Sequence, residues 1–226
     1  MSPGIIRPEG FAPPVKAFFT TKVFGRDLSA LAGAAGLRAG SLYLPIQKHT
    51  DRVVVIEGNP EPTVADAVIT QMRGLFVGIQ VADCVPVLLF DKRAQAVGAV
   101  HAGWRGTAAG ILKKAIAKMT DRFGTSLSDL TVALGPSIRR CCYQVGHEVV
   151  EAVEKGTGDG AYVTVRSGSR YLDLTAANII QARSAGVIPG NIWLSPDCTH
   201  CLPEKYYSYR FAKGVAGRQY GFIGIP

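Results

Sequence analysis

Histidine is scarce in this sequence, and long apolar runs are missing from it. The chain of 226 residues contains four histidines. No stretch approaches the roughly 18 consecutive apolar residues that a membrane-spanning helix needs. The N-terminal residues also lack the basic region followed by an apolar segment that marks a secretory signal. We therefore expect a cytoplasmic protein that makes no contact with a membrane.

Basic residues outnumber acidic ones, but they form no polybasic run. The formal net charge is +8, and the densest basic groups are Lys113-Lys114 and Arg139-Arg140. No nucleic-acid-binding motif accompanies them. We expect no nucleic-acid partner, whereas the basic balance favours small anionic substrates.

The number of cysteines is odd, which argues against a disulfide framework. The five cysteines are Cys84, Cys141, Cys142, Cys198 and Cys201, and in a reducing compartment we expect them to be buried, metal-bound or catalytic. Cys198-Thr199-His200-Cys201 resembles a metal or redox pair, but no second Cys-x-x-Cys completes four ligands, so we expect a structural role. The adjacent Cys141 and Cys142 are expected to line the core or a pocket, because neighbouring side chains diverge.

Short apolar runs predict strands that are buried on both faces. These runs are 67–70, 75–81, 85–90 and 96–101, with further strands expected at 53–56, 131–134 and 191–194. Helices are expected at 27–37, 108–119, 145–154 and 175–185, with Thr107 and Asp173 as N-terminal caps and Gly124 as a C-terminal stop. We expect one α+β domain over residues 1–226, with mixed β-sheets flanked by helices and an extended segment at 1–14.

Three side chains with metal-binding chemistry flank the expected strands. His49 precedes one strand, Cys84 lies between two, and His101 ends another. A cysteine and two histidines suit zinc with a fourth position left for water or substrate, and a thiolate also admits copper. The spacing leaves two other interpretations open. A lone cysteine in an apolar run is commonly a small buried residue, and a histidine before a glycine turn commonly bonds only to backbone.

A glycine-rich segment follows His101. Gly103 and Gly106 flank Trp104 and Arg105 shortly before the expected helix. Backbone N–H groups at a helix start favour an anion, and Arg105 would add a contact to a phosphate or carboxylate. A tight turn around a packed Trp104 explains the same residues without a ligand.

Several long motifs resemble those of the YfiH family, which is also called the laccase-domain or polyphenol oxidase family. They occur in the family's order: QKH at 47–49, ADCVPVLL at 82–89, VHAGWRGT at 100–107, GPSI at 135–138, CCYQVG at 141–146, DCT at 197–199 and GRQ at 217–219. The resemblance implies a mixed α/β fold similar to a cysteine-hydrolase scaffold. It also implies a catalytic metal, usually zinc, that is held by His49, Cys84 and His101.

The activity that the resemblance implies is that of a purine nucleoside enzyme. Family members are described as phosphorolysing adenosine, inosine, guanosine and methylthioadenosine and as deaminating adenosine. In this chain Arg105 would bind the phosphate, and Asp83 would orient a ligand or carry a proton.

Three other functions stay open. Bacterial members of the family are also linked to removal of a misincorporated serine from a muramoyl precursor of peptidoglycan, for which Cys84 would be the nucleophile and His101 its base. A non-catalytic binding domain would carry a closed structural metal site with four ligands. A copper-dependent phenol oxidase would need single-metal chemistry, because four histidines without a His-x-His pair cannot build the sites of a multicopper laccase.

Overall fold

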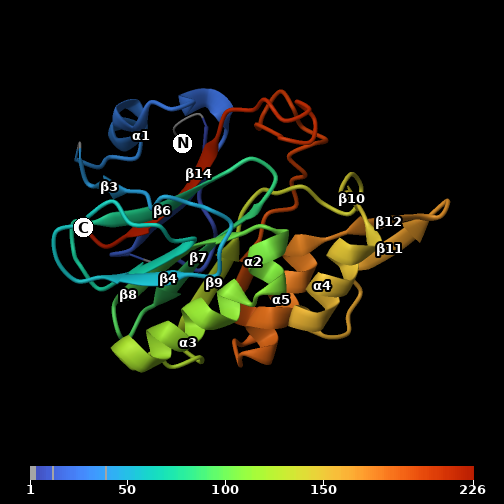
Figure 1. The fold of residues 1–226 in the computed structure, drawn as a ribbon. Coiled ribbons are helices and arrows are strands. Elements are labelled where there is room, and N and C mark those ends of the chain that lie inside the picture. The colour runs from blue at the N-terminus through green and yellow to red at the C-terminus, as the bar shows by residue number, and fades with distance from the viewer. Residues whose placement is uncertain (1–3, 12, 39) are drawn as a thin grey trace.

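Two mixed β-sheets pack against each other in the computed structural model, which describes residues 4–11, 13–38 and 40–226 (Figure 1). The larger sheet has six strands in the order β13-β9-β7-β8-β5-β4, and the smaller has five in the order β1-β2-β14-β6-β3. A small third sheet has the order β10-β12-β11. The strands are β1 (Ile5–Ile6), β2 (Lys16–Thr20), β3 (Leu42–Tyr43), β4 (Val53–Ile56), β5 (Ala67–Thr70), β6 (Phe76–Val81), β7 (Val85–Asp91), β8 (Ala96–Ala102), β9 (Leu130–Leu134), β10 (Gln144–Val145), β11 (Val163–Arg166), β12 (Ser169–Leu172), β13 (Ile192–Leu194) and β14 (Gln219–Gly224).

Helices cover the face of the six-stranded sheet that points away from the five-stranded sheet (Figure 1). The helices are α1 (Leu28–Ala34), α2 (Trp104–Ala108), α3 (Ile111–Phe123), α4 (His147–Thr157) and α5 (Leu174–Ser184), with short 3-10 turns at Lys22–Phe24 and Pro189–Asn191. Helices α2 to α5 lie together on this face, and α1 lies beside the five-stranded sheet. The expected α+β class with mixed sheets and flanking helices is confirmed. Among the described residues, no helix is long and apolar enough to cross a membrane.

Strand β7 illustrates why the central strands are apolar along their whole length. Val85, Val87 and Leu89 belong to the core beneath the helices. Leu88 and Phe90 alternate with them and belong to the core between the two sheets. Successive side chains of a strand point to opposite faces, so a strand covered on both sides is apolar at every position.

Two of the three expected helix caps are confirmed. Gly124 ends α3 in the left-handed conformation at φ 65°, and the Asp173 side chain accepts a hydrogen bond from the N–H of Ala176 at the start of α5. The prediction for Thr107 is wrong, because it lies inside α2 and its hydroxyl accepts a hydrogen bond from the Asn178 amide at 2.9 Å. Gly110, in the left-handed conformation at φ 71°, separates α2 from α3.

The sequence-based prediction missed β2 and β14, which form the middle of the five-stranded sheet. Strand β14 pairs with β2 on one side and with β6 on the other. Its glycines weaken the strand pattern. At Gly224 a Cβ atom would lie 2.6 Å from the carbonyl oxygen of Leu75, so the close approach of the backbone requires glycine there. The helix expected to start at Val145 begins instead at His147, because Val145 pairs with Arg170 of β12.

Candidate metal centre and cavity

The register of β7 on β8 brings Cys84 next to His101. Val85 pairs with Ala102, and Pro86 pairs with His101, in an antiparallel ladder. Cys84 directly precedes β7, so it lies beside the end of β8 that carries His101. The sequence predicted that both residues lie at strand ends, and the pairing of these two strands brings them into contact.

A loop before β4 delivers His49 to the same place. His49 adopts a positive φ of 58°, which is uncommon for a residue with a side chain. The carboxylate of Asp66 stabilises this loop by accepting hydrogen bonds from the backbone N–H groups of Lys48, His49 and Thr50 at 3.2, 3.0 and 2.6 Å. The Thr50 hydroxyl donates a further bond at 2.8 Å. The conformation of His49 therefore depends on a buried charge at the start of β5.

Gln47 attaches the other end of this loop to the five-stranded sheet. Its side-chain amide donates to the carbonyl of Gln80 at 2.9 Å, and its side-chain oxygen accepts from the N–H of Gln80 at 2.8 Å. The loop is thus held by β5 on one side and by β6 on the other.

Asp66 also orients the imidazole of His101. Its Oδ1 lies 2.8 Å from His101 Nδ1, and both side chains are buried. Burial raises the pKa of Asp66, but hydrogen bonds from His101 and Thr50 outweigh it and hold the pKa well below its usual range. With Nδ1 bonded to the carboxylate, Nε2 is the nitrogen left to face Cys84 and His49. This carboxylate–histidine pairing is typical of metal-ligating histidines.

The ligand atoms of His49, Cys84 and His101 all lie within 4.8 Å of one another, and we call this group the His-Cys-His site. The two imidazole rings are 4.8 Å apart between centroids and meet at 71°. His101 is buried, Cys84 is half-buried and His49 is exposed. A thiolate and two imidazole nitrogens are donors that zinc and copper prefer, and three of them leave a coordination position open.

Cys84 and His101 shift each other's protonation. Burial raises the pKa of Cys84, but the charge of His101 and hydrogen bonds from both histidines lower it to about 6. Burial lowers the pKa of His101, whereas the charge of Cys84 and the hydrogen bond to Asp66 raise it to about 9. The thiolate is therefore favoured at neutral pH, and the thiolate is the form that binds metals and attacks electrophiles.

Asp83 lies at the turn before Cys84 with a positive φ of 85°, and its carboxylate is buried. It accepts hydrogen bonds from the hydroxyl groups of Thr199 at 2.6 Å and Ser208 at 3.0 Å, and from the N–H of Arg210 at 2.7 Å. These partners belong to the loop between β13 and β14. Asp83 thus joins that loop to the turn that presents Cys84.

A cavity of about 490 Å³ opens onto the His-Cys-His site. Aromatic and basic side chains make up much of its wall, and the lining residues are Gln47, His49, Gln80, Val81, Ala82, Asp83, Cys84, His101, Trp104, Arg105, Ile138, Tyr143, Leu174, Tyr209, Arg210 and Arg218. The guanidinium of Arg105 lies 4.4 Å from the centre of the Trp104 ring. Within the part of the chain that the structure describes, no hydrogen bond or ion pair engages the Arg105 side chain. Arg105 is therefore free to bind an anion in the cavity.

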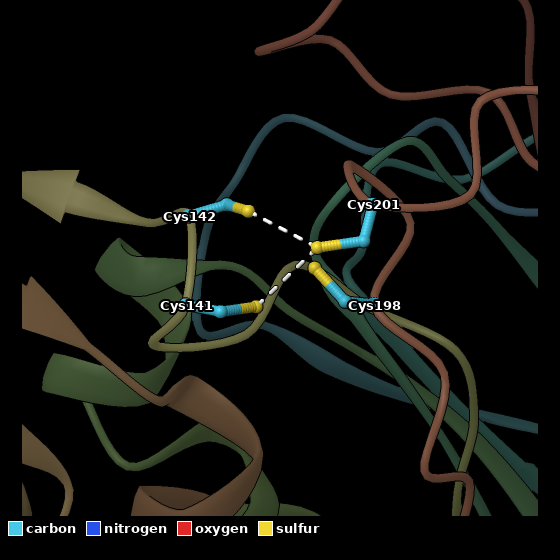
Figure 2. Close-up of side chains that lie close together, drawn as sticks. All are labelled: Cys141, Cys142, Cys198 and Cys201. Atoms are coloured by element: carbon cyan, nitrogen blue, oxygen red, sulfur yellow. Dashed lines mark hydrogen bonds between the residues drawn. The ribbon is translucent and has the colours of Figure 1, made fainter.

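The other four cysteines do not line this cavity. The prediction that the side chains of Cys141 and Cys142 diverge is wrong. Figure 2 shows the sulfur atoms of Cys141, Cys142, Cys198 and Cys201 facing one another. All four lie within 4.8 Å of one another, so the adjacent Cys141 and Cys142 do not diverge from a common centre. Cys141 is exposed and does not belong to the core. We call this group the four-cysteine cluster.

The sequence matches a known protein family over most of its length. A family model described as multi-copper polyphenol oxidoreductase laccase matches residues 22–226. The chain belongs to this family. The resemblance to the YfiH family is thereby confirmed, and two solved structures support it. The structure of a hypothetical protein YfiH from Bacillus licheniformis superposes with a TM-score of 0.92 at 27% identity over 99% of this chain and 97% of that one. YlmD from Geobacillus stearothermophilus gives a TM-score of 0.90 at 28% identity over 100% of this chain and 97% of that one.

Relatives in this laccase-like family carry the names of purine nucleoside enzymes. A purine nucleoside phosphorylase from Clostridium acetobutylicum is 39% identical over 78% of this chain and 74% of its own length. An adenosine deaminase from an unknown prokaryotic organism is 36% identical over 86% of this chain and 78% of its own length.

Gly103 leaves just enough room for the His-Cys-His site, and its replacement by alanine is expected to weaken metal binding. A Cβ atom at Gly103 would lie 3.0 Å from Cys84 Sγ and 3.2 Å from His49 Cδ2, so two ligands would have to move. We expect the affinity for zinc to fall by about tenfold or more, as it does when the support of a ligand is disturbed. Competition with a chromogenic chelator measures this. Gly190→Ala, where a Cβ would meet nothing within 4 Å, is the matched control and should bind zinc as the wild type does.

Proposed function

We propose that this chain is a metal-dependent purine nucleoside enzyme, which phosphorolyses adenosine, inosine, guanosine and methylthioadenosine and deaminates adenosine. The observation that carries the proposal is the His-Cys-His site, with its open position, at the floor of a cavity of about 490 Å³. The names of the purine nucleoside phosphorylase and adenosine deaminase relatives support the substrate class.

In this proposal His49, Cys84 and His101 hold a zinc ion, for which copper is the alternative. The bound ion supplies Lewis-acid chemistry next to an open coordination position. Asp66 keeps Nδ1 of His101 occupied, so Nε2 stays directed at the site. Asp83 acts as a positioning residue, because its carboxylate is fully engaged by the loop that covers the cavity.

The cavity wall offers separate places for the parts of the substrates. Tyr143, Tyr209 and Trp104 provide aromatic surface for a purine. Arg105 provides a free guanidinium for phosphate. In phosphorolysis a phosphate oxygen forms a bond to the ribose carbon, the glycosidic bond breaks, and the purine leaves with the bonding electrons and takes up a proton. In deamination water adds to the amino-bearing carbon of adenine, and ammonia leaves.

Incubation of the metal-loaded protein with adenosine, with and without phosphate, tests the proposal. Chromatography separates the products. Adenine that forms only when phosphate is present establishes phosphorolysis, and inosine establishes deamination. If a protein that carries its zinc yields neither product, the nucleoside function is refuted.

Arg105→Ala is expected to raise the KM for phosphate while leaving the KM for the nucleoside nearly unchanged. A hydrogen bond to a charged group contributes about 1.5–3 kcal/mol, which corresponds to roughly a 10- to 100-fold change. Steady-state kinetics with each substrate varied in turn measure the two constants. Arg93→Ala is the control, because Arg93 lies in the turn at the opposite end of β7 from Cys84. An unchanged KM for phosphate in Arg105→Ala would remove Arg105 from the anion site.

A second candidate function rests on the contacts of His101, whose ring lies between the thiol of Cys84 and the carboxylate of Asp66. A thiolate beside an imidazole that a carboxylate orients is the arrangement of a cysteine hydrolase, which suits amide cleavage in a peptidoglycan precursor. This candidate predicts that iodoacetamide alkylates Cys84 at pH 7 whether or not metal is bound. Peptide mapping after alkylation locates the label. Protection of Cys84 by stoichiometric zinc would count against a nucleophilic role and for a ligand role.

A further inference from the structure

The four-cysteine cluster brings together two segments that are distant in the sequence. Cys141 and Cys142 lie in the turn before β10, and Cys198 and Cys201 lie in the loop after β13 (Figure 2). The Sγ of Cys201 is 3.3 Å from that of Cys142 and 3.6 Å from that of Cys141. All four sulfur atoms lie within 4.8 Å of one another.

The backbone holds these two segments together independently of the sulfur atoms. Ser137 and Cys198 form a parallel bridge, and the N–H of Thr199 donates to the Ser137 carbonyl at 3.1 Å. The N–H of Arg139 points at Cys198 Sγ from 3.4 Å, which is the kind of contact that stabilises a thiolate. The cluster is therefore placed by the fold and is not a chance meeting of mobile side chains.

The turn explains how two adjacent cysteines face one centre. The N–H groups of Cys142 and Tyr143 both donate to the carbonyl of Arg139, at 2.9 Å each. The chain reverses within these residues, so consecutive side chains do not alternate as they do in a strand. Cys141 and Cys142 supply one half of the cluster, and the Cys198-x-x-Cys201 pair supplies the other.

The spacing of the sulfur atoms matches one tetrahedral ion. Four thiolates at about 2.3 Å from a zinc ion lie about 3.8 Å from one another. The separations of 3.3 and 3.6 Å and the limit of 4.8 Å bracket that value. An iron–sulfur cluster would separate some of the sulfurs further, because it distributes the four thiolates over two or more iron atoms. A disulfide would engage only two of these cysteines, and all four are free.

We propose that the four-cysteine cluster binds one zinc ion, which is separate from any ion at the His-Cys-His site. Four protein ligands close the coordination sphere, which is typical of a structural zinc site. The ion would fasten the turn that carries Tyr143, a residue of the cavity wall, to the loop whose Thr199 and Arg210 bind Asp83. It would thus stabilise one side of the cavity without taking part in the reaction.

Metal content measured by elemental analysis tests the proposal with variants of both sites. We expect about two zinc ions per chain in the wild type, about one in Cys201→Ser, about one in Cys84→Ala and none in the double variant. Cys201 is exposed, so serine there disturbs the core little. Zinc content that is the same in Cys201→Ser as in the wild type, while Cys84→Ala loses its ion, would overturn the four-cysteine site and leave the proposed function intact.

Two further measurements keep the test independent of whether Cys201→Ser folds. Cobalt-substituted wild-type protein should show sulfur-to-cobalt absorption with the tetrahedral pattern of four thiolates, and this signal should persist in Cys84→Ala. Thiol titration of the unfolded, chelated protein without reductant should find all five cysteines. A titration that finds about three, and rises to five only after reduction, would identify a disulfide in the cluster and overturn the proposal.

Discussion

Replacing Cys84 with alanine is expected to remove one zinc ion per chain and to lower phosphorolysis of adenosine by at least about a thousandfold. A Lewis-acidic ion stabilises developing charge by several kcal/mol, and about 4 kcal/mol corresponds to that factor. The effect should be this large because Cys84 is the single thiolate of the His-Cys-His site. Elemental analysis gives the metal content, and initial rates with saturating phosphate give the activity.

The comparison with chelated wild-type protein separates a lost ligand from a lost fold. Cys84→Ala and wild type, both treated with chelator so that neither keeps an ion at the four-cysteine cluster, should unfold at nearly the same temperature, because the cysteine is half-buried and alanine fits its space. The variant should also remain inactive when zinc is added in excess. Full zinc content and full activity in Cys84→Ala would refute both the ligand set and the metal dependence.

Asp66→Asn is expected to have the largest effect on stability among single changes near the site. Asp66 is completely buried, and the loop of His49 and the ring of His101 both donate hydrogen bonds to it. Asparagine presents an NH2 group to donors that need an acceptor, so we expect a loss of about 3 kcal/mol in the free energy of unfolding. The affinity for zinc should fall about 10- to 100-fold, because His101 loses its orienting partner.

Chemical denaturation and zinc competition measure the two effects of Asp66→Asn. Asp51→Asn is the matched control, since Asp51 is 44% exposed and pairs with Lys114 at the surface. That change should cost less than about 1 kcal/mol and leave the zinc affinity unchanged. If Asp66→Asn proved as mild as Asp51→Asn, the carboxylate would not organise the site.

The stability difference between wild type and Asp66→Asn should also depend on pH in a defined direction. The pKa of Asp66 is held below its value of about 3.9 in an unfolded chain, so the folded state favours the ionised form. Its contribution to stability is fully present above about pH 5 and is lost as the pH falls below about 4. Unfolding curves of the two proteins should therefore converge in acid and stay apart at neutral pH.

The sequence pointed to the His-Cys-His site because its three residues stand at the ends of apolar runs. Strand register then places Cys84 beside His101, as expected for neighbouring strands that pair. Asp66 escaped notice because its role depends on where the loop of His49 returns to β5. A carboxylate at the start of an apolar strand was the available signal, since a buried charge needs several donors.

Two other features depend on contacts that spacing does not reveal. The four-cysteine cluster joins residues near 141 to residues near 200. The turn at Arg139 lets the adjacent Cys141 and Cys142 face the same centre, although their side chains were expected to diverge. Strand β14 contains glycines that weaken its strand pattern, yet it pairs with another strand along each of its two edges. In each case contacts between segments distant in the sequence determine the structure, and local sequence preference does not reveal those contacts.

The central position of β14 also determines when the five-stranded sheet is completed during synthesis. Strand β2 ends at Thr20, and its partner β14 begins at Gln219. At translation rates of about 5–20 residues per second, roughly 10–40 s separate the two strands. Until β14 is made, β2 and, from its own synthesis, β6 each have an edge without its partner strand, and such an edge is a template for aggregation. Nascent chains of this protein are therefore expected to need protection by chaperones until β14 has left the ribosome.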